Sequence, residues 1–220
     1  MQSLNEYNSV EHALQYLAIA DKIPHRTAGE AALLEFIPPT ARRILDLGAG
    51  DGRLLALLRL DRPAFRGIAA DLSPTMLDSA RARFAGDPLI EVIEYDLDQR
   101  LPDLGTFDAI VSCFAIHHCS HERKHSLYAE IFAALEPEGV FYNLEHVASP
   151  TPELHAQFLD ALGITPEQED QSNQLLDVQP QLEWMREIGY QQVDCHWKWR
   201  ELALFGGIRP SHESPDRRTS

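Results

Sequence analysis

The stretch Ile44–Gly52, ILDLGAGDG, decides the fold class of this chain. Ile44, Leu45 and Leu47 have the apolar character of a strand that is buried on both faces. The leucines that follow, at positions 54, 55, 57 and 58, have helical spacing. Glycines at positions 48, 50 and 52 lie between the two patterns, and without a Cβ they allow positive φ angles and close approach of a ligand. The stretch therefore predicts a strand, a ligand-binding turn and a helix.

The charge of the turn indicates which ligand it holds. A dinucleotide site requires GxGxxG, followed by an acidic residue about 20 positions later for the ribose. Here the spacing is GxGxG, and Asp46 and Asp51 lie beside the glycines. Carboxylates at this distance repel a pyrophosphate but attract a ligand with an ammonium and a sulfonium centre. The turn therefore favours S-adenosylmethionine over NAD.

Two further predicted strands also end in acidic residues. Residues 65–71 end at Asp71, and Ser73-Pro74 provides an N-cap and a first turn for a helix that runs to about position 84. Residues 90–95 form a third strand, followed by Asp96. At the ends of these strands Asp71 can accept hydrogen bonds from ribose hydroxyls, and Asp96 from an adenine amino group. The alternation of strands and helices up to position 147 predicts a doubly wound parallel sheet that binds ligands outside its strand C-termini.

We expect one domain over residues 1–208 and a disordered tail over residues 209–220, whose composition is rich in Pro, Ser and Arg. A helical cap spans residues 1–40, with two helices between 10 and 37 that are split at Ile23-Pro24. The cofactor-binding core spans 41–147. The substrate-side segment, 148–208, contains a helix over 149–163, an acidic loop over 165–177 that can serve as a lid, and a helix over 179–188. It closes with an antiparallel pair of strands, 191–199 and 201–205.

Composition restricts the partners and the compartment. The net charge of −15 over 220 residues disfavours binding to a phosphate backbone, so we expect no nucleic-acid partner. Three cysteines make no disulfide framework and fit a reducing cytoplasm. No apolar run reaches the ~20 residues of a membrane span, and the N-terminal sequence has no signal-peptide pattern. We expect a cytoplasmic protein without a membrane partner, and both a monomer and a homodimer fit the sequence.

Five segments, taken in order, resemble the motif series of the class I S-adenosylmethionine-dependent methyltransferases: ILDLGAGDG, AADLSP, EYDLDQRLP, FDAIVSCFAIHH and LEPEGVFYNLEHV. The resemblance covers roughly residues 41 to 147. It implies a Rossmann-like, doubly wound, mostly parallel seven-stranded sheet with a C-terminal antiparallel hairpin and an N-terminal helical cap. It also implies an enzyme that moves a methyl group from S-adenosylmethionine to a small-molecule acceptor by in-line displacement.

The same resemblance implies which residues bind the cofactor. Asp46 and the glycine turn surround its methionine part, Asp71 and Leu72 hold ribose and adenine, and Cys113 or Phe114 line the floor. Arg53 departs from the family pattern, in which a small residue is frequent. We add Arg26, because the cofactor carboxylate requires a cation and the turn offers none nearby. The predicted cofactor-binding set is Asp46, Gly48, Ala49, Gly50, Gly52, Asp71, Leu72, Met76, Asp96, Leu97, Cys113, Phe114 and Arg26.

The catalytic residues are harder to predict, because methyl transfer depends on alignment and requires a base only when the acceptor carries a proton. His117 and His118 follow the fourth strand and are the candidate bases. The alternative is that one of them caps a helix or bonds a carbonyl and the other is solvated. Glu145 and His146, at the end of the fifth strand, are further candidates to line the acceptor pocket. The Cys and His residues within 113–121 lack the spacing of a zinc site, so we expect no metal.

Two other functions are compatible with these motifs. A carboxy-S-adenosylmethionine synthase has a similar cap and a similar aromatic-rich last hairpin, but it requires cations for a second carboxylate. The helix over 179–188 has Arg186 as its only cation, so a further cation would have to come from Arg26, Lys198 or Arg200. The second alternative is a non-methylating relative, either a cofactor-binding module or a cyclase. The sequence leaves the acceptor open, including whether oxygen, nitrogen or carbon is methylated.

Overall fold

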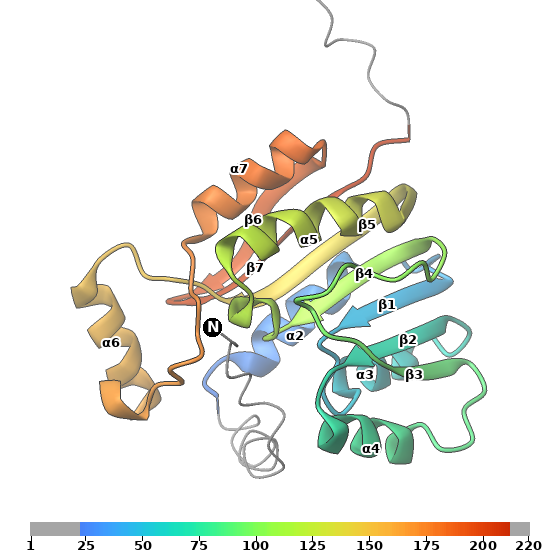
Figure 1. Cartoon of the computed structure of the whole chain (residues 1–220), viewed down its shortest axis with the longest axis horizontal. Helices are drawn as coiled ribbons and strands as arrows, with labels where there is room; N and C mark the ends of the chain where they lie inside the picture. The colour runs from blue at the N-terminus through green and yellow to red at the C-terminus, as the bar shows by residue number, and fades with distance from the viewer. Residues whose placement is uncertain (1–22, 212–220) are drawn as a thin grey trace, which may run out of the picture.

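A seven-stranded sheet forms the middle layer of the computed structural model, which describes residues 23–211 (Figure 1). The strand order is β3-β2-β1-β4-β5-β7-β6. The strands are β1 (Arg43–Leu47), β2 (Arg66–Asp71), β3 (Ile90–Glu94), β4 (Phe107–Cys113), β5 (Leu135–His146), β6 (Gln191–Trp199) and β7 (Leu202–Ile208). The helices are α2 (Arg26–Phe36), α3 (Arg53–Asp61), α4 (Pro74–Arg83), α5 (His121–Ala134), α6 (Pro152–Leu162) and α7 (Val178–Ile188), with short 3-10 turns η2 (Ile116–His118) and η3 (Pro166–Gln168).

The topology confirms the predicted Rossmann-like, doubly wound arrangement. Strands β3, β2, β1, β4 and β5 pair in parallel, whereas β7 pairs antiparallel with both β5 and β6. The predicted closing hairpin is therefore present, but its second strand was predicted too early and too short. It begins at Leu202, because Arg200 has a φ of +51° and makes the turn. It continues to Ile208, which still pairs with Val140 of β5.

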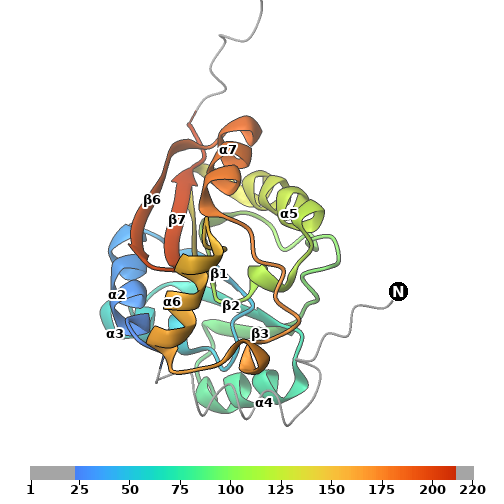
Figure 2. The same ribbon diagram turned by 90° about the vertical axis from the view of Figure 1, so that its left-hand side faces the viewer.

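Helices cover both faces of the sheet, as Figures 1 and 2 show. Leu45 and Leu47 of β1 belong to a core cluster that is closed by α5 and α7. Ile44, on the opposite face of the strand, belongs to the cluster that α2 and α3 close. All three side chains are fully buried, and each such burial stabilises the fold by about 1.5–3 kcal/mol. Asp46 lies at a buried position of the same strand, where the alternation calls for an apolar residue.

The described part of the helical cap is α2, which agrees with the second of the two helices expected before the sheet. It packs against β5, β6 and β7. The first expected helix of the cap lies outside the described residues, as does the part of the expected tail from residue 212 onward.

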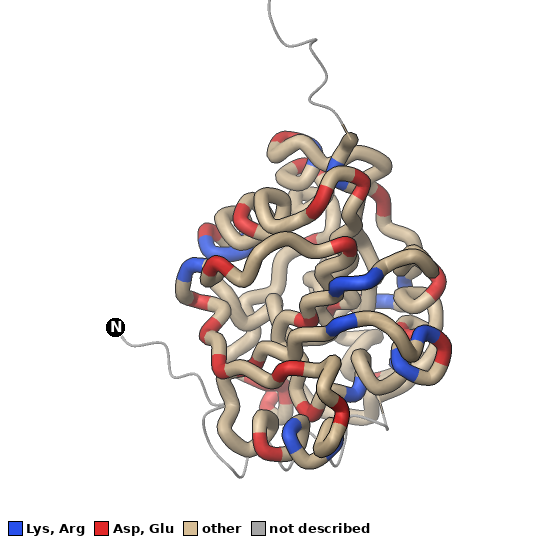
Figure 3. Tube along the Cα trace, turned by 90° about the vertical axis from the view of Figure 1, so that its right-hand side faces the viewer, with Lys and Arg blue, Asp and Glu red and all other residues tan. Residues whose placement is uncertain are grey.

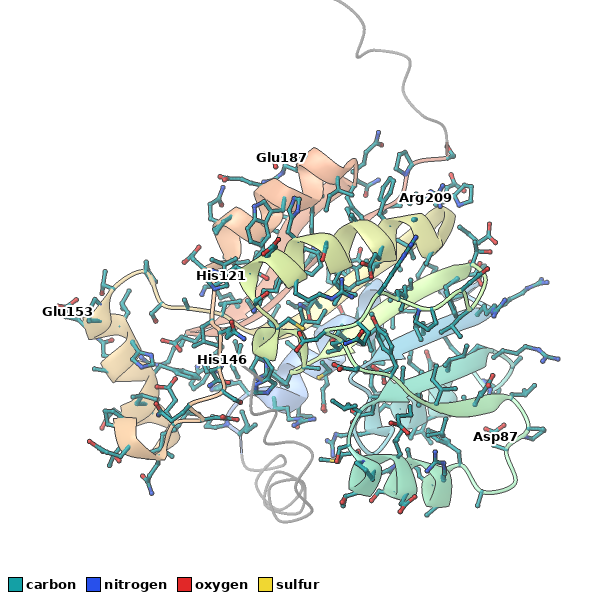
Figure 4. The ribbon with its side chains drawn as sticks, in the orientation of Figure 1. Asp87, His121, His146, Glu153, Glu187 and Arg209 are labelled. Atoms are coloured by element: carbon teal, nitrogen blue, oxygen red, sulfur yellow. The ribbon has the colours of Figure 1, made fainter. Side chains whose placement is uncertain are left out.

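Helix α5 runs directly into β5, and Arg209 supports this junction. A helix leaves its last carbonyl groups without intrahelical partners. The Arg209 guanidinium donates hydrogen bonds to the carbonyl oxygens of Ala133 (3.2 Å) and Leu135, and Figure 4 shows it beside the last turn of α5. The Arg209 amide also donates to the Gly139 carbonyl at 2.8 Å. Arg209, placed in the tail by the sequence, thus belongs to the ordered end of the sheet.

The charged side chains are mostly acidic. The whole sequence contains 34 Asp and Glu against 19 Lys and Arg. Figure 3 shows acidic positions spread along one side, with basic positions in separate places between them. The expectation that the chain avoids nucleic acid rests on this charge and stays a prediction. Among residues 23–211, no helix combines the length and the apolar character that a membrane crossing requires.

Candidate functional site

A cavity of about 490 Å³ lies at the carboxyl ends of the parallel strands. In Figure 1 these ends point toward α6 and the segment that follows it. All of the predicted cofactor residues except Gly52 line this cavity. The structure therefore brings together side chains from α2, the glycine turn, α4 and the ends of β2 and β4. They surround one space that is large enough for a small-molecule ligand.

The glycine turn begins where β1 ends, and its first glycine is required by close packing. Gly48 has a φ of +67°, and its amide donates to the Ala70 carbonyl at 2.8 Å. A Cβ added at this position would lie 2.1 Å from the Ala115 Cβ. Gly50 differs, because among residues 23–211 only the Met76 sulfur, at 4.0 Å, lies near its Cβ position. At Gly48 the turn thus packs closely against Ala115, and at Gly50 it leaves room for a ligand.

Gly52 is the predicted cofactor residue that does not line the cavity. It has a φ of +79° and precedes the first residue of α3. A Cβ at this position would lie 2.4 Å from the Phe84 ring, which follows α4. Gly52 therefore permits close packing beside α3, and a direct role in ligand binding stays a prediction.

Asp46 is a buried carboxylate without a partner in the described part of the chain. Its side chain is 1% exposed, and neither carboxylate oxygen has a hydrogen-bond partner among residues 23–211. Burial, and then the charges of Asp71 and Asp51, raise the pKa of Asp46 from 3.8 to about 8. An ionised carboxylate in such a place is strongly unfavourable unless a cation accompanies it. The residue thus fits a ligand that brings a positive charge to the turn.

Asp71 ties the glycine turn to the end of β2. Its Oδ2 accepts from the Gly50 amide and its Oδ1 from the Ser73 amide, both at 2.8 Å. Burial raises the pKa of Asp71, whereas the amide hydrogen bonds of Ser73, Gly50 and Leu72 act in the opposite direction, and the net shift is upward. A carboxylate has about four lone-pair sites, so one remains for a ligand hydroxyl beside the three amide hydrogen bonds.

Ser73 is the N-cap residue of α4 and Pro74 is its first residue, as predicted. The buried Ser73 hydroxyl, however, makes no cap hydrogen bond and has no partner among the described residues. The Ser73 amide donates to the Asp71 carboxylate, two positions earlier.

Arg26 and Arg53 share the carboxylate of Glu30 at the cavity wall. Arg26 Nε donates to Glu30 Oε1 at 2.9 Å, and Arg53 Nε contacts both Glu30 oxygens at 3.1 and 3.2 Å. Glu30 is 3% exposed, so two guanidinium groups meet one buried carboxylate beside the cavity. The sequence analysis identified Arg26 but missed Glu30 and the cationic role of Arg53. The i,i+4 spacing of Arg26 and Glu30 was the available signal.

The two candidate histidines occupy different environments. His117 is buried and does not line the cavity, and its Nδ1 lies 2.5 Å from Glu145 Oε1. His118 lines the cavity, and its Nδ1 lies 3.0 Å from the Ser172 hydroxyl. The ring centroids are 4.0 Å apart. His117 is therefore held by a buried carboxylate, whereas His118 lies at the cavity.

The carboxyl group of Glu145 is held in its charged form by its neighbours. Burial raises the pKa of Glu145, but the His117 charge and hydrogen bond, the His146 amide and the Lys124 charge outweigh burial, and the net shift of this pKa is downward. Lys124 is itself 1% exposed, and burial lowers its pKa.

Residues 170–174, which we call the lid segment, cross in front of the strand ends (Figure 2). The sequence predicted a solvated acidic loop here that can act as a lid. Gln171, Ser172 and Gln174 line the cavity, so the polar side chains of the segment face the ligand space. The sequence gave no indication that these side chains face the cavity, because the position of the lid segment depends on its contacts with η2.

His146 belongs to a separate network at the end of β5, as Figure 4 shows. Its Nε2 lies 2.9 Å from Glu201 Oε2, and the other oxygen of Glu201 lies 2.9 Å from His155 Nδ1. Neither Glu145 nor His146, both predicted as candidates for an acceptor pocket, lines the cavity. Within residues 23–211, no group of three or more His, Cys, Asp or Glu side chains is arranged to hold a metal ion.

Comparison with known proteins finds methyltransferases. A family model described as a methyltransferase domain matches residues 44–139. The chain is similar to demethylmenaquinone methyltransferase from Clavibacter sepedonicus, with 33% identity over 115 residues, which are 52% of this chain and 45% of that protein. It is also similar to trans-aconitate 2-methyltransferase from Methylobacterium radiotolerans, with 33% identity over 136 residues, covering 59% of this chain and 48% of that protein. The matched part therefore spans about half the length of these relatives.

A solved structure shares the fold. The structure of an O-methyltransferase family protein from Burkholderia thailandensis superposes with a TM-score of 0.73 and 20% sequence identity. The superposition covers 96% of this chain and 64% of that chain. The described sheet and its flanking helices are thus an arrangement that occurs in experimentally determined structures.

Proposed function

We propose that this chain is a class I S-adenosylmethionine-dependent methyltransferase and that it transfers a methyl group to a small-molecule acceptor bound in the cavity. One observation carries the proposal: the buried Asp46 carboxylate lines the cavity at the glycine turn and has no protein partner among the described residues. S-adenosylmethionine, the cofactor, brings an ammonium and a sulfonium centre. The acceptors in the names of the relatives, demethylmenaquinone and trans-aconitate, support a small molecule rather than a macromolecule.

The cavity residues divide into groups that suit the parts of this cofactor. We assign Asp46 and the glycine turn to the methionine part, and Asp71 with Leu72 to ribose and adenine. We assign Asp96 to the adenine amino group, and the Arg26–Glu30–Arg53 cluster to the carboxylate. The two guanidinium groups that line the cavity support the last assignment, because guanidinium groups bind carboxylates through charge-assisted hydrogen bonds.

The chemistry requires one nucleophile and, for a protonated acceptor, one base. The acceptor atom forms a bond to the methyl carbon as the carbon–sulfur bond breaks, and that electron pair goes to sulfur. The proton of the acceptor goes to the base. We assign this role to His118, because it lines the cavity whereas His117 does not. His117 is assigned to the support of η2 through Glu145.

The proposal is tested by native mass spectrometry of the freshly purified protein, followed by denaturation to identify any released small molecule. S-adenosylmethionine or S-adenosylhomocysteine supports the proposal and directs the search to acceptor libraries. A cofactor heavier by one carboxylate would instead favour a carboxy-S-adenosylmethionine synthase. A protein that is empty and fails to bind added S-adenosylmethionine in calorimetry would refute the assignment of the site.

The variant Asp71→Ala is expected to lower the affinity for S-adenosylmethionine by about 10- to 100-fold, because it removes a charge-assisted hydrogen bond worth about 1.5–3 kcal/mol. Isothermal titration calorimetry measures the change. Asp78→Ala is the matched control, since Asp78 is an exposed acid on α4 that pairs with Arg81. Equal affinities for the two variants would show that Asp71 does not bind the cofactor.

The variant His117→Ala is expected to lower the free energy of unfolding by about 3 kcal/mol, because it leaves the buried Glu145 carboxylate without its main partner. His118→Ala is the matched comparison, and we expect it to change stability much less. Urea denaturation of both variants at the same pH measures the difference. Equal losses of stability would contradict the separate roles of the two histidines.

A further inference from the structure

We propose that Asp170 and Ser172 of the lid segment fix the tautomer of His118, and that they are therefore positioning residues for proton removal from the acceptor. The inference deepens the proposed function and rests on it. It concerns residues that neither the motifs nor the comparisons assign. Three facts carry it: the hydrogen-bond chain from Asp170 to His118, the attachment of the lid segment to η2, and the position of His118 at the cavity.

The direction of each hydrogen bond in the chain follows from the chemistry of the groups. The Ser172 amide and hydroxyl both lie within hydrogen-bond distance of Asp170 Oδ1, at 2.8 and 2.7 Å. A carboxylate only accepts, so the single hydroxyl hydrogen of Ser172 points to Asp170. The Ser172 oxygen, 3.0 Å from His118 Nδ1, is then an acceptor. His118 Nδ1 must carry a hydrogen, and in the neutral ring the lone pair is on Nε2.

The lid segment is attached to the same turn that holds the histidines. The Gln174 amide donates to the His117 carbonyl at 3.0 Å, and the Gln174 side chain donates to the His118 carbonyl at 2.9 Å. Lys124 Nζ donates to the Gln174 carbonyl at 2.7 Å and to the His117 carbonyl at 3.2 Å. Asp170 and Ser172 are thus placed at His118 by contacts independent of the His118 ring.

The charges around the ring suit a base. His117, with Glu145 behind it, lies on one side of the His118 ring, and Asp170 lies beyond Ser172 on another. Lys124, from α5, donates to the backbone carbonyl of His117. In the transfer the bond between the acceptor atom and its hydrogen breaks, and the proton goes to Nε2. The same acceptor atom bonds the methyl carbon while the carbon–sulfur pair goes to sulfur. Nδ1–H remains on Ser172, so the positive charge that forms on the ring faces the Asp170 carboxylate through one hydroxyl.

The test is long-range proton–nitrogen correlation NMR of the full-length, nitrogen-15-labelled protein at about pH 8.5, where an ordinary histidine is neutral. His118→Gln identifies the signals of His118 by their loss. We expect the Nδ1–H tautomer in the wild type. In Ser172→Ala we expect the Nδ1–H tautomer to become the minor form, whereas Ser172→Thr, which keeps the hydroxyl, restores it. Asp170→Asn keeps an acceptor oxygen and should retain the Nδ1–H tautomer.

Gln171→Ala is the matched control, because Gln171 is in the same segment and lines the same cavity, and it should leave the tautomer unchanged. An Nε2–H tautomer in the wild type, or a Ser172→Ala spectrum identical to that of the wild type, would overturn the inference. Calorimetry with S-adenosylmethionine separates this failure from failure of the proposed function. The wild type should bind the cofactor. No binding by the wild type would overturn the proposed function, and with it the catalytic use of the tautomer.

Discussion

Replacement of Asp46 by asparagine is expected to weaken binding of S-adenosylmethionine by about 100-fold and, at the same time, to stabilise the ligand-free protein. The two effects have one cause. Asp46 is buried, its carboxylate has no partner among the described residues, and Asp71 and Asp51 add like charges nearby. A cationic ligand supplies the missing partner, and a charge-assisted interaction of this kind is worth about 3 kcal/mol. Asparagine removes both the unfavourable charge and the attraction.

The pH dependence of stability separates this explanation from a simple loss of packing. The folded protein holds the Asp46 proton up to about pH 8, whereas the unfolded chain releases it near 3.8. Between these values the folded state binds more protons, so the free energy of unfolding of the wild type falls as the pH rises. The full effect is on the order of 5 kcal/mol, at about 1.4 kcal/mol per pKa unit.

Urea denaturation of the ligand-free wild type and Asp46→Asn across this pH range measures the contribution. The variant should lack this part of the slope, and the exposed-site control Asp78→Asn should retain it. Calorimetry near pH 7 in buffers of different ionisation enthalpy should show proton release from the wild type on cofactor binding and less release from Asp46→Asn. Equal slopes in the wild type and Asp46→Asn would contradict the explanation.

Gly48→Ala is expected to lower the free energy of unfolding by about 3 kcal/mol or more and to abolish measurable binding of S-adenosylmethionine. Two costs add at this position. A φ of +67° is unfavourable for alanine by about 1–2 kcal/mol, and the new Cβ would lie 2.1 Å from the Ala115 Cβ. Relief of that overlap costs about 1–3 kcal/mol and displaces the turn that lines the cavity.

Gly163→Ala provides a matched control for the backbone cost alone. Gly163 ends α6 with a φ of +70°, and nothing lies within 4 Å of its Cβ position. Its replacement should cost about 1 kcal/mol and leave cofactor binding unchanged. Chemical denaturation and calorimetry of both variants measure the difference. If the two substitutions lowered the free energy of unfolding equally, the overlap with Ala115 would not explain the effect of Gly48→Ala.

The residues that line the cavity at the glycine turn and at the strand ends were predictable because their positions are encoded locally. The glycine turn and the acids at positions 71 and 96 follow directly after strands, and parallel strands bring such positions to one edge of a sheet. The N-cap position of Ser73 and the start of α4 at Pro74 were predictable for the same reason. The sequence did not reveal that the Ser73 hydroxyl makes no cap hydrogen bond.

The pairing of Glu30 and the environments of the two histidines depend on contacts between distant positions, which spacing does not reveal. Glu30 meets Arg53 across 23 residues, His117 meets Glu145 across 28, and Ser172 meets His118 across 54. The sequence identified two adjacent histidines as equivalent candidates, because their difference is set by β5 and by the lid segment. The need for glycine at position 52 was also hidden in the sequence, since its neighbour Phe84 follows α4, two helices later in the chain.

The position of β7 between β5 and β6 has a consequence for biosynthesis. Strand β5 ends at residue 146, but β7, its partner on one side, is not complete until residue 208. At about 5–20 residues per second, a ribosome takes roughly three to twelve seconds to make that interval. During this time the nascent chain can form the parallel strands, while one edge of β5 keeps an open row of amide and carbonyl groups. Protection of that edge during translation, by a chaperone or by slow release, is therefore expected to govern the yield of native protein in cells.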